Sequence, residues 1–476
     1  PAENFFTLES ETATGISVDG ADGNDTISGY HGDDYLDGGA GNDKVIVDNN
    51  DLTSTDYING GAGTDTIEIS ENASTVADAA FTNVSNVENI THTAGDQITL
   101  LTLGAKAAAA GINTVTFTTD AAASTVNVTN LFTNAITFDF GTVAALDATA
   151  SHVINAAPTT ATTYTGDLSI TGSGSAFDTT AATITGGSGV NDTITVSGGG
   201  TPLMTSVTNI EKVVLSSATD DASVTLLNAN ATYTNGSSYQ TITIDGSAMT
   251  SGALTAAADA EVDAKVIIIG GGAADSITAD ASANFGSSIV AGGGNDTISI
   301  VGTGALTSDD TISGGSGTDT LTITTDSTTL ADVDFTNITG VEKLVGDANA
   351  EVTATLGAQA DEAGINDIVF EGDGAGAVTV LSTFDNALSV EINTEAVADK
   401  IDASASSSTL TVTGLIASLT AAETVKGGTG TSDTVTLTAD DGTATTTLMT
   451  GIETITVAYA ANKDATIAMG ANDLQI

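Results

Sequence analysis

Three consecutive nine-residue segments constrain the fold of this chain more than any other feature of its sequence. Residues 20 to 46 read GADGNDTIS, GYHGDDYLD and GGAGNDKVI, with glycine at positions one and four, aspartate at six and an aliphatic residue at eight. Glycine permits turns with positive φ, and an aliphatic residue can begin a short buried strand. The pattern therefore predicts regular coils in which turns alternate with strands.

The aspartates of these segments bring anionic oxygen into the turns. Calcium prefers carboxylate and carbonyl oxygens, and the segments resemble the RTX calcium-binding repeat. That resemblance implies one coil for every two nonapeptides, with Asp25 and Asp43 on one side and Asp34 on the other. Asp65 follows Asp43 by 22 residues, and Asp56 follows Asp34 by the same number, so two columns are expected. The alternative is that glycine and aspartate only form turns.

A second cluster of the same motif lies between residues 270 and 321. Its aspartates are Asp275, Asp296 and Asp319, at intervals of 21 and 23 residues. Asp310 is expected on the opposite side of the coils. Ala273 stands where the motif has its second conserved glycine, so the motif at Asp275 departs from the family pattern.

These two clusters supply all the residues that we expect to bind calcium. In the N-terminal cluster they are Gly20, Asp22, Gly23, Asp25, Gly29, Gly32, Asp34, Gly38, Gly41, Asp43, Asp56, Gly60, Gly63 and Asp65. In the second cluster they are Gly270, Asp275, Gly294, Asp296, Asp310, Gly314, Gly317 and Asp319.

Longer repeats organise the whole chain. DYINGGAGTDTIEI at 56 to 69 returns as DTISGGSGTDTLTI at 310 to 323, so the two halves are homologous. Weaker copies give four units, whose marker aspartates are Asp65, Asp192, Asp319 and Asp433. Each marker is followed 19 to 23 residues later by a glutamate, in order Glu88, Glu211, Glu342 and Glu453. We interpret these glutamates as marking a strand end. The motifs at Asp192 and Asp433 contain one extra residue and are interpreted as turns.

Period-two patterns such as TITVS at 193 to 197 predict half-buried strands throughout. Helices are expected only at 104 to 110 and 357 to 363, closed by Gly111 and Gly364. The predicted fold class is all-β, an elongated β-solenoid or β-roll with RTX segments and repeated β-rich modules. The expected divisions are an N-terminal roll at 1–71, repeat modules at 72–260, a second calcium-binding segment at 261–325 and further modules at 326–476.

Charge and missing motifs exclude several functions. The chain has 61 acidic residues against 8 lysines, a net charge of −53, so nucleic acid is not an expected partner. There is no cysteine, and no apolar run reaches the roughly 18 residues of a transmembrane segment. The three histidines are isolated, and neither HExxH nor GxSxG occurs, so we expect no enzyme activity.

RTX segments combined with long Thr-, Ala- and Gly-rich repeats resemble the surface-layer proteins of Gram-negative bacteria. The resemblance implies export by type I secretion, calcium binding outside the cell and self-assembly into a two-dimensional lattice. It also implies a cell-surface polysaccharide as an anchoring partner, through residues that the sequence does not identify. The alternatives are an RTX-type adhesin or biofilm protein and the noncatalytic scaffold of a secreted RTX enzyme.

Overall fold

The computed structural model describes most of the chain. The described residues are 3–7, 15–29, 31–47, 51–70, 75–92, 99–117, 124–141, 152–157, 163–174, 177, 183–202, 204–228, 230, 240–261, 264–280, 286–302, 306–325, 328–347, 351–371, 376–392, 399–419, 423–439, 443–445, 449–458 and 466–468. The chain divides into two compact units, Pro1–Ala248 and Met249–Ile476. The division into four segments expected from the sequence stays a prediction.

The N-terminal unit is built almost entirely of short strands. Its elements are β1 Phe5–Thr7, β2 Ser17–Asp19, β3 Thr26–Gly29, β4 Tyr35–Ala40, β5 Lys44–Val47, β6 Tyr57–Ala62, β7 Thr66–Ile69, η1 Asp78–Asn83, β8 Val84–Ser85, β9 Asn89–His92, β10 Leu101–Leu103, α1 Ala105–Ala110, β11 Thr114–Phe117, β12 Thr125–Val128, β13 Ile136–Asp139, β14 Val153–Asn155, β15 Leu168–Ser173, β16 Thr183–Thr185, β17 Thr193–Ser197, η3 Met204–Ser206, β18 Val207–Thr208, β19 Lys212–Leu215, β20 Ala222–Leu227 and β21 Thr241–Asp245.

The C-terminal unit repeats this organisation. Its elements are β22 Leu254–Ala260, β23 Lys265–Ile269, β24 Ser276–Asp280, β25 Ser288–Gly293, β26 Thr297–Val301, β27 Thr311–Ser316, β28 Thr320–Ile323, β29 Thr328–Leu330, η4 Asp332–Phe335, β30 Ile338–Thr339, β31 Lys343–Gly346, β32 Val352–Leu356, α2 Ala358–Ala363, β33 Asp367–Phe370, β34 Ala377–Val380, β35 Leu388–Ile392, β36 Lys400–Asp402, β37 Leu410–Leu415, η5 Ile416–Ser418, β38 Thr424–Lys426, β39 Thr434–Thr438, β40 Thr443–Thr445, β41 Met449–Thr450, β42 Thr454–Ala458 and β43 Thr466–Ala468.

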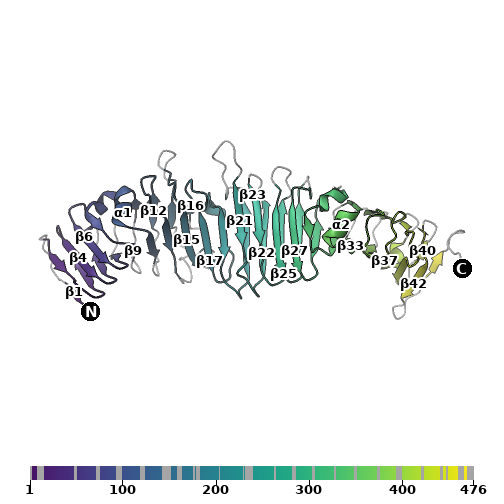
Figure 1. Cartoon of the computed structure of the whole chain (residues 1–476), viewed down its shortest axis with the longest axis horizontal. Helices are drawn as coiled ribbons and strands as arrows, with labels where there is room; N and C mark the ends of the chain where they lie inside the picture. Colours follow the sequence, from purple (N-terminus) through teal and green to yellow (C-terminus); the bar gives the residue numbers. More distant parts are fainter. Residues whose placement is uncertain are drawn as a thin grey trace. The chain divides into compact units, whose positions relative to one another are not determined.

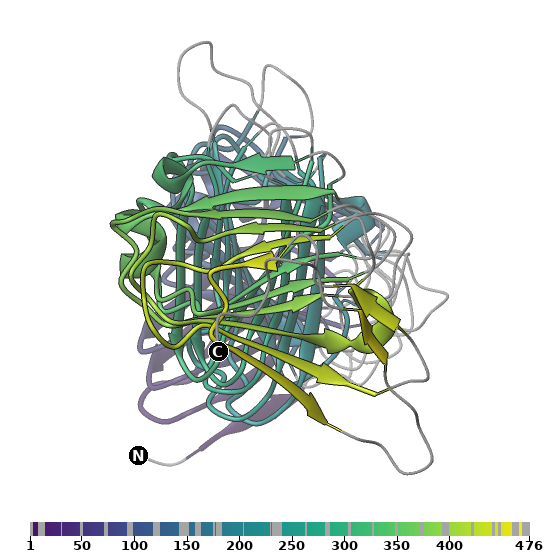
Figure 2. The ribbon, with the colours of Figure 1, turned by 90° about the vertical axis from the view of Figure 1, so that its right-hand side faces the viewer.

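Within each unit the strands form parallel sheets in which successive coils lie side by side (Figure 1). In the N-terminal unit, β1, β3, β5, β7 and β9 pair in that order, while β2, β4, β6 and β8 form a separate sheet. In the C-terminal unit, the strands from β33 to β42 lie in layers one behind another (Figure 2). Because neighbouring strands come from successive coils, each unit is a β-solenoid, and the predicted fold class is confirmed.

Stacked aliphatic side chains form the core. Ile27, Val45, Ile67 and Ile90 pair in register on β3, β5, β7 and β9, and each is at most 2% exposed. Alternate residues on the same strands face outward, which explains the period-two pattern. Burying one such side chain contributes about 1.5–3 kcal/mol, so the stack supplies much of the stability of these coils.

The two expected helices are present. Gly111 and Gly364 close α1 and α2 in the left-handed conformation, with φ of 107° and 103°. The sequence did not show that each helix is capped from another coil. The Asp78 carboxylate accepts hydrogen bonds from the N–H groups of Gly104, Lys106 and Ala107 at 2.8 to 3.1 Å. Asp332 occupies the same place at α2.

No helix within the described ranges has the length and apolar character needed to cross a membrane.

Candidate calcium-binding columns

Asp25, Asp43 and Asp65 form a column along one edge of the N-terminal coils, as the resemblance implied. Each lies directly before a strand of one sheet, and each is at most 2% exposed. The N–H of Asp25 donates to Oδ1 of Asp43, and the N–H of Asp43 donates to Oδ1 of Asp65, both at 2.7 Å. Each carboxylate therefore ties its own coil to the preceding one.

The second carboxylate oxygen of each of these aspartates is buried and accepts no hydrogen bond from the described residues. Leaving a buried charged group unsatisfied costs free energy, more than the 1–3 kcal/mol typical of a neutral group. A cation beside Oδ2 would remove that cost. This unpaired oxygen is the feature that distinguishes the column from ordinary aspartate turns.

Glycines let these carboxylates pack closely against the backbone of the neighbouring coil. A Cβ atom at Gly20 would lie 2.7 Å from Oδ2 of Asp25 and 2.5 Å from the carbonyl oxygen of Gly38. The corresponding place at Gly38 is lined by Oδ2 of Asp43 and the carbonyl oxygen of Gly60. Calcium prefers carboxylate and carbonyl oxygens such as these. The residues present therefore fit a calcium ion.

Backbone carbonyls would have to supply many of the ligands. In the part of the chain that the structure describes, no three histidine or acidic side chains cluster closely enough to hold one metal ion. The fourth-position glycine brings the turns of neighbouring coils together. Gly41 has a φ of 145°, and any side chain there would overlap the carbonyl oxygen of Gly23. This contact explains why the motif requires glycine at this position.

Burial makes the column electrostatically unfavourable without a cation. Burial first, and then the negative charges of Asp43 and Glu88, raise the pKa of Asp65 to about 6, against a backbone hydrogen bond that lowers it. Burial also raises the pKa of Asp43, with the charge of Asp25 adding to the effect. A bound divalent ion would favour the ionised forms.

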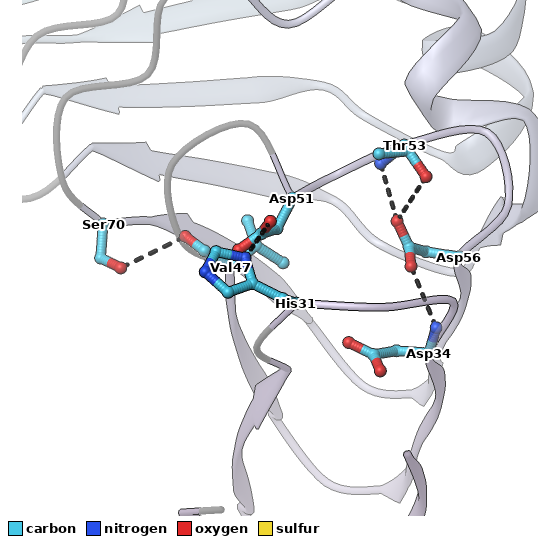
Figure 3. A network of polar contacts seen from close by, with 7 residues as sticks. All are labelled: His31, Asp34, Val47, Asp51, Thr53, Asp56 and Ser70. Atoms are coloured by element: carbon cyan, nitrogen blue, oxygen red, sulfur yellow. Dashed lines mark hydrogen bonds and ion pairs between the residues drawn. The ribbon is translucent and has the colours of Figure 1, made fainter. Parts of the chain in front are cut away.

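The opposite column contains Asp34 and Asp56 (Figure 3). The N–H of Asp34 donates to Oδ1 of Asp56 at 3.0 Å, so these residues also stack on neighbouring coils. Oδ2 of Asp56 accepts from the N–H and hydroxyl of Thr53 at 2.7 and 3.0 Å. Both oxygens of Asp56 are thus engaged. Burial raises the pKa of Asp34, and His31 pairs with Asp51 beside it at 2.7 Å.

The second cluster forms an equivalent column in the C-terminal unit. The N–H of Asp275 donates to Oδ1 of Asp296 at 2.7 Å, and the N–H of Asp296 donates to Oδ1 of Asp319 at 2.8 Å. Oδ2 of Asp296 and of Asp319 is buried without a hydrogen-bond partner among the described residues. Ala291 stands where the first glycine of the motif would precede Asp296, so this turn accommodates a Cβ atom at that position.

Other expected ligands have carboxylates that backbone groups already satisfy. Oδ2 of Asp275 accepts from the N–H of Gly271 at 2.7 Å. Asp310, on the opposite side, accepts from the N–H groups of Ser287 and Thr307. Asp22 lies exposed on its turn. Both carboxylate oxygens of Asp275 and of Asp310 are therefore engaged, whereas Asp22 is exposed to solvent.

Asp192 and Asp433 behave as the turn interpretation expected. Their Oδ2 atoms accept from the N–H groups of Gly187 and Gly428, at 2.7 and 2.6 Å. The difference from Asp43 and Asp65 therefore lies in the turn and not in the position of the aspartate on its coil.

The structure also gives the marker glutamates a role that the sequence did not predict. Each lies directly before a strand, and its Oε2 accepts from the N–H of the marker aspartate one coil earlier, at 2.8 to 2.9 Å; the four are Glu88, Glu211, Glu342 and Glu453. Their spacing of about one coil behind the aspartates was the signal that could have revealed this bond.

Comparison with known families agrees with this geometry. The RTX calcium-binding nonapeptide repeat matches residues 17–45, 53–68 and 305–322, in four copies. No curated protein and no solved structure matches the chain. The chain thus contains RTX repeats, which bind calcium and are typical of secreted proteins.

Proposed function

We propose that this chain is a subunit of a bacterial surface layer, exported by type I secretion, in which calcium controls both folding and assembly into a two-dimensional lattice. The observation that carries the proposal is the pair of columns with unpaired buried carboxylate oxygens, one in each unit, in a chain of net charge −53. The negative charges of such a chain repel one another, within one copy and between copies, until cations bind.

The difference between low cytosolic calcium and higher extracellular calcium keeps the chain unfolded for export and lets it fold and assemble outside the cell. Extracellular calcium sites have dissociation constants of about 0.1–1 mM. At millimolar calcium, each site of that kind stabilises the folded chain by about 0.4–1.4 kcal/mol. Several sites together decide whether the columns fold. A chain that stays unfolded at low cytosolic calcium remains suitable for export.

The assembly step is tested by electron microscopy of purified protein. Calcium is first set just high enough to fold the chain, as judged by circular dichroism. One sample then receives more calcium and a matched sample receives sodium chloride at equal ionic strength. Ordered sheets in calcium alone support the proposal. If ordered sheets form equally in both salts, calcium promotes assembly only by screening charge. If particles stay dispersed in both, an adhesin is the better proposal.

A further inference from the structure

The turn after the last nonapeptide repeats the geometry of a calcium-binding turn in both units. It reads Asn86-Val87-Glu88 in the N-terminal unit and Gly340-Val341-Glu342 in the C-terminal unit, outside the residues that match the RTX repeat. Oε2 of Glu88 accepts from the N–H of Asp65 at 2.8 Å. Glu88 therefore takes the place on its coil that Asp65 and Asp43 take on theirs.

The backbone of this turn also matches. Asn86 and Gly340 are left-handed, with φ of 51° and 62°. A side chain at Gly60 would overlap the carbonyl oxygen of Asn86 and lie 2.7 Å from Oδ2 of Asp65. Gly314 has the same relation to Gly340 and to Oδ2 of Asp319, again at 2.7 Å. The turn thus supplies a carbonyl oxygen where the glycine of a following nonapeptide would.

The last aspartate of each column needs such a partner. Asp65 is 1% exposed and Asp319 is fully buried, and the Oδ2 atom of each is unpartnered among the described residues. We propose that Glu88 and Glu342 are calcium ligands that complete the last site of each column, with Asp65 and Asp319 and with the carbonyls of Asn86 and Gly340. This assignment rests on calcium binding by the columns themselves.

The chain contains its own control for this assignment. Glu211 and Glu453 accept the same hydrogen bond from Asp192 and Asp433, at 2.9 Å. There, however, backbone N–H groups already satisfy Oδ2 of the aspartate. Without an unpaired oxygen opposite it, the glutamate does not form a calcium site. We therefore expect Glu211 and Glu453 not to bind calcium, although Oε1 of Glu211 is also buried without a hydrogen-bond partner among the described residues.

The charges explain why a glutamate at this position favours a cation. Without metal, the acidic side chain of Glu88 lies beside the buried Asp65, to whose N–H group it is hydrogen-bonded at 2.8 Å. A divalent ion between the two carboxylates attracts both. Glutamine keeps an oxygen that can accept the N–H of Asp65 but removes the charge. The substitution E88Q therefore separates metal binding from the hydrogen bond.

The first test counts calcium ions on the full chain by equilibrium dialysis and calorimetric titration. Compared with wild type, E88Q/E342Q should lose two ions or bind two of them about tenfold more weakly, because affinity follows ligand charge. The matched control E211Q/E453Q should bind as wild type does. Circular dichroism at saturating calcium verifies that both variants are folded.

The second readout is the melting temperature, because a purely structural glutamate would respond identically with and without metal. E88Q/E342Q should melt below wild type in saturating calcium, and this difference should shrink as calcium is lowered toward the concentration that just folds the chain. If wild type binds calcium and E88Q/E342Q binds the same number equally tightly, this assignment is wrong and the proposed function stands. If wild type binds no calcium, both are wrong.

Discussion

At the scale of single residues, the aspartates that precede the strands differ in whether one carboxylate oxygen, Oδ2, accepts a hydrogen bond. All tie neighbouring coils together through Oδ1. Oδ2 is unpaired in Asp43 and Asp65 but accepts a backbone N–H in Asp192 and Asp433. The sequence showed the aspartates and their spacing. It could not show the second oxygen's partner, because that depends on the backbone conformation of the turn, which brings an N–H group within reach in some turns and not in others.

Asp43→Asn tests the role of the unpaired oxygen. It keeps an acceptor for the N–H of Asp25 but removes the charge. In saturating calcium we expect a loss of about 1–3 kcal/mol of unfolding free energy, and a smaller loss at calcium just sufficient for folding, measured by urea unfolding. For D192N, the change should be the same with and without calcium. A calcium-independent loss in D43N would contradict the role assigned to Oδ2.

The raised pKa of Glu211 predicts that folding stability depends on pH, independently of calcium. Burial raises its pKa to about 7 and that of Asp192 to about 6. The folded state therefore holds these protons more tightly than the unfolded state. The contribution of Glu211 is complete below its ordinary pKa of 4.5 and that of Asp192 below 3.8, and both are lost as pH rises through 6 to 7. The coils around β17 and β19 should thus be more stable in mild acid.

The substitution E211Q should remove part of this dependence. In saturating calcium at pH 8, we expect E211Q to be more stable than wild type by on the order of 1–2 kcal/mol, because a partly buried charge is gone. At pH 5 the two proteins should converge. Urea unfolding at both values checks this. An equal difference at pH 5 and pH 8 would mean that Glu211 titrates normally.

At the scale of elements, strands and helices were the most predictable part of the structure. Alternation of Thr with Ile or Val predicted β17 and β21, and an alanine run ended by Gly111 predicted α1. The cap on α1 could not be predicted, because the N–H groups that donate to Asp78 lie 26 or more residues away in the sequence. Contacts between coils do not follow from local patterns.

The α1 cap gives a prediction that does not depend on calcium. Asp78→Ala leaves three N–H groups at the start of the helix without their acceptor, and should cost about 1–2 kcal/mol. Asp78→Asn keeps one oxygen and should cost less. Thermal unfolding should show the same loss in calcium and in chelator. A loss seen only in calcium would mean that Asp78 also holds a metal ion.

At the scale of the whole molecule, net charge and stacked coils act together. Coils of a solenoid contact mainly their neighbours, so each column can order only the coils near it. Salt at physiological strength screens over about 8 Å, which does not neutralise carboxylates buried within a coil. Sodium should therefore fail to replace calcium in folding, and circular dichroism should show strand signal rising only when calcium is added.

The most direct test is hydrogen exchange of the full chain with and without calcium, measured by mass spectrometry and resolved by segment. Removing calcium should abolish backbone protection in β3 to β7 and β24 to β28, next to the unpaired carboxylates, more than in β15 to β17 and β37 to β39. Protection that falls equally in all these segments, or survives in chelator, would contradict the claim that these columns fold around calcium.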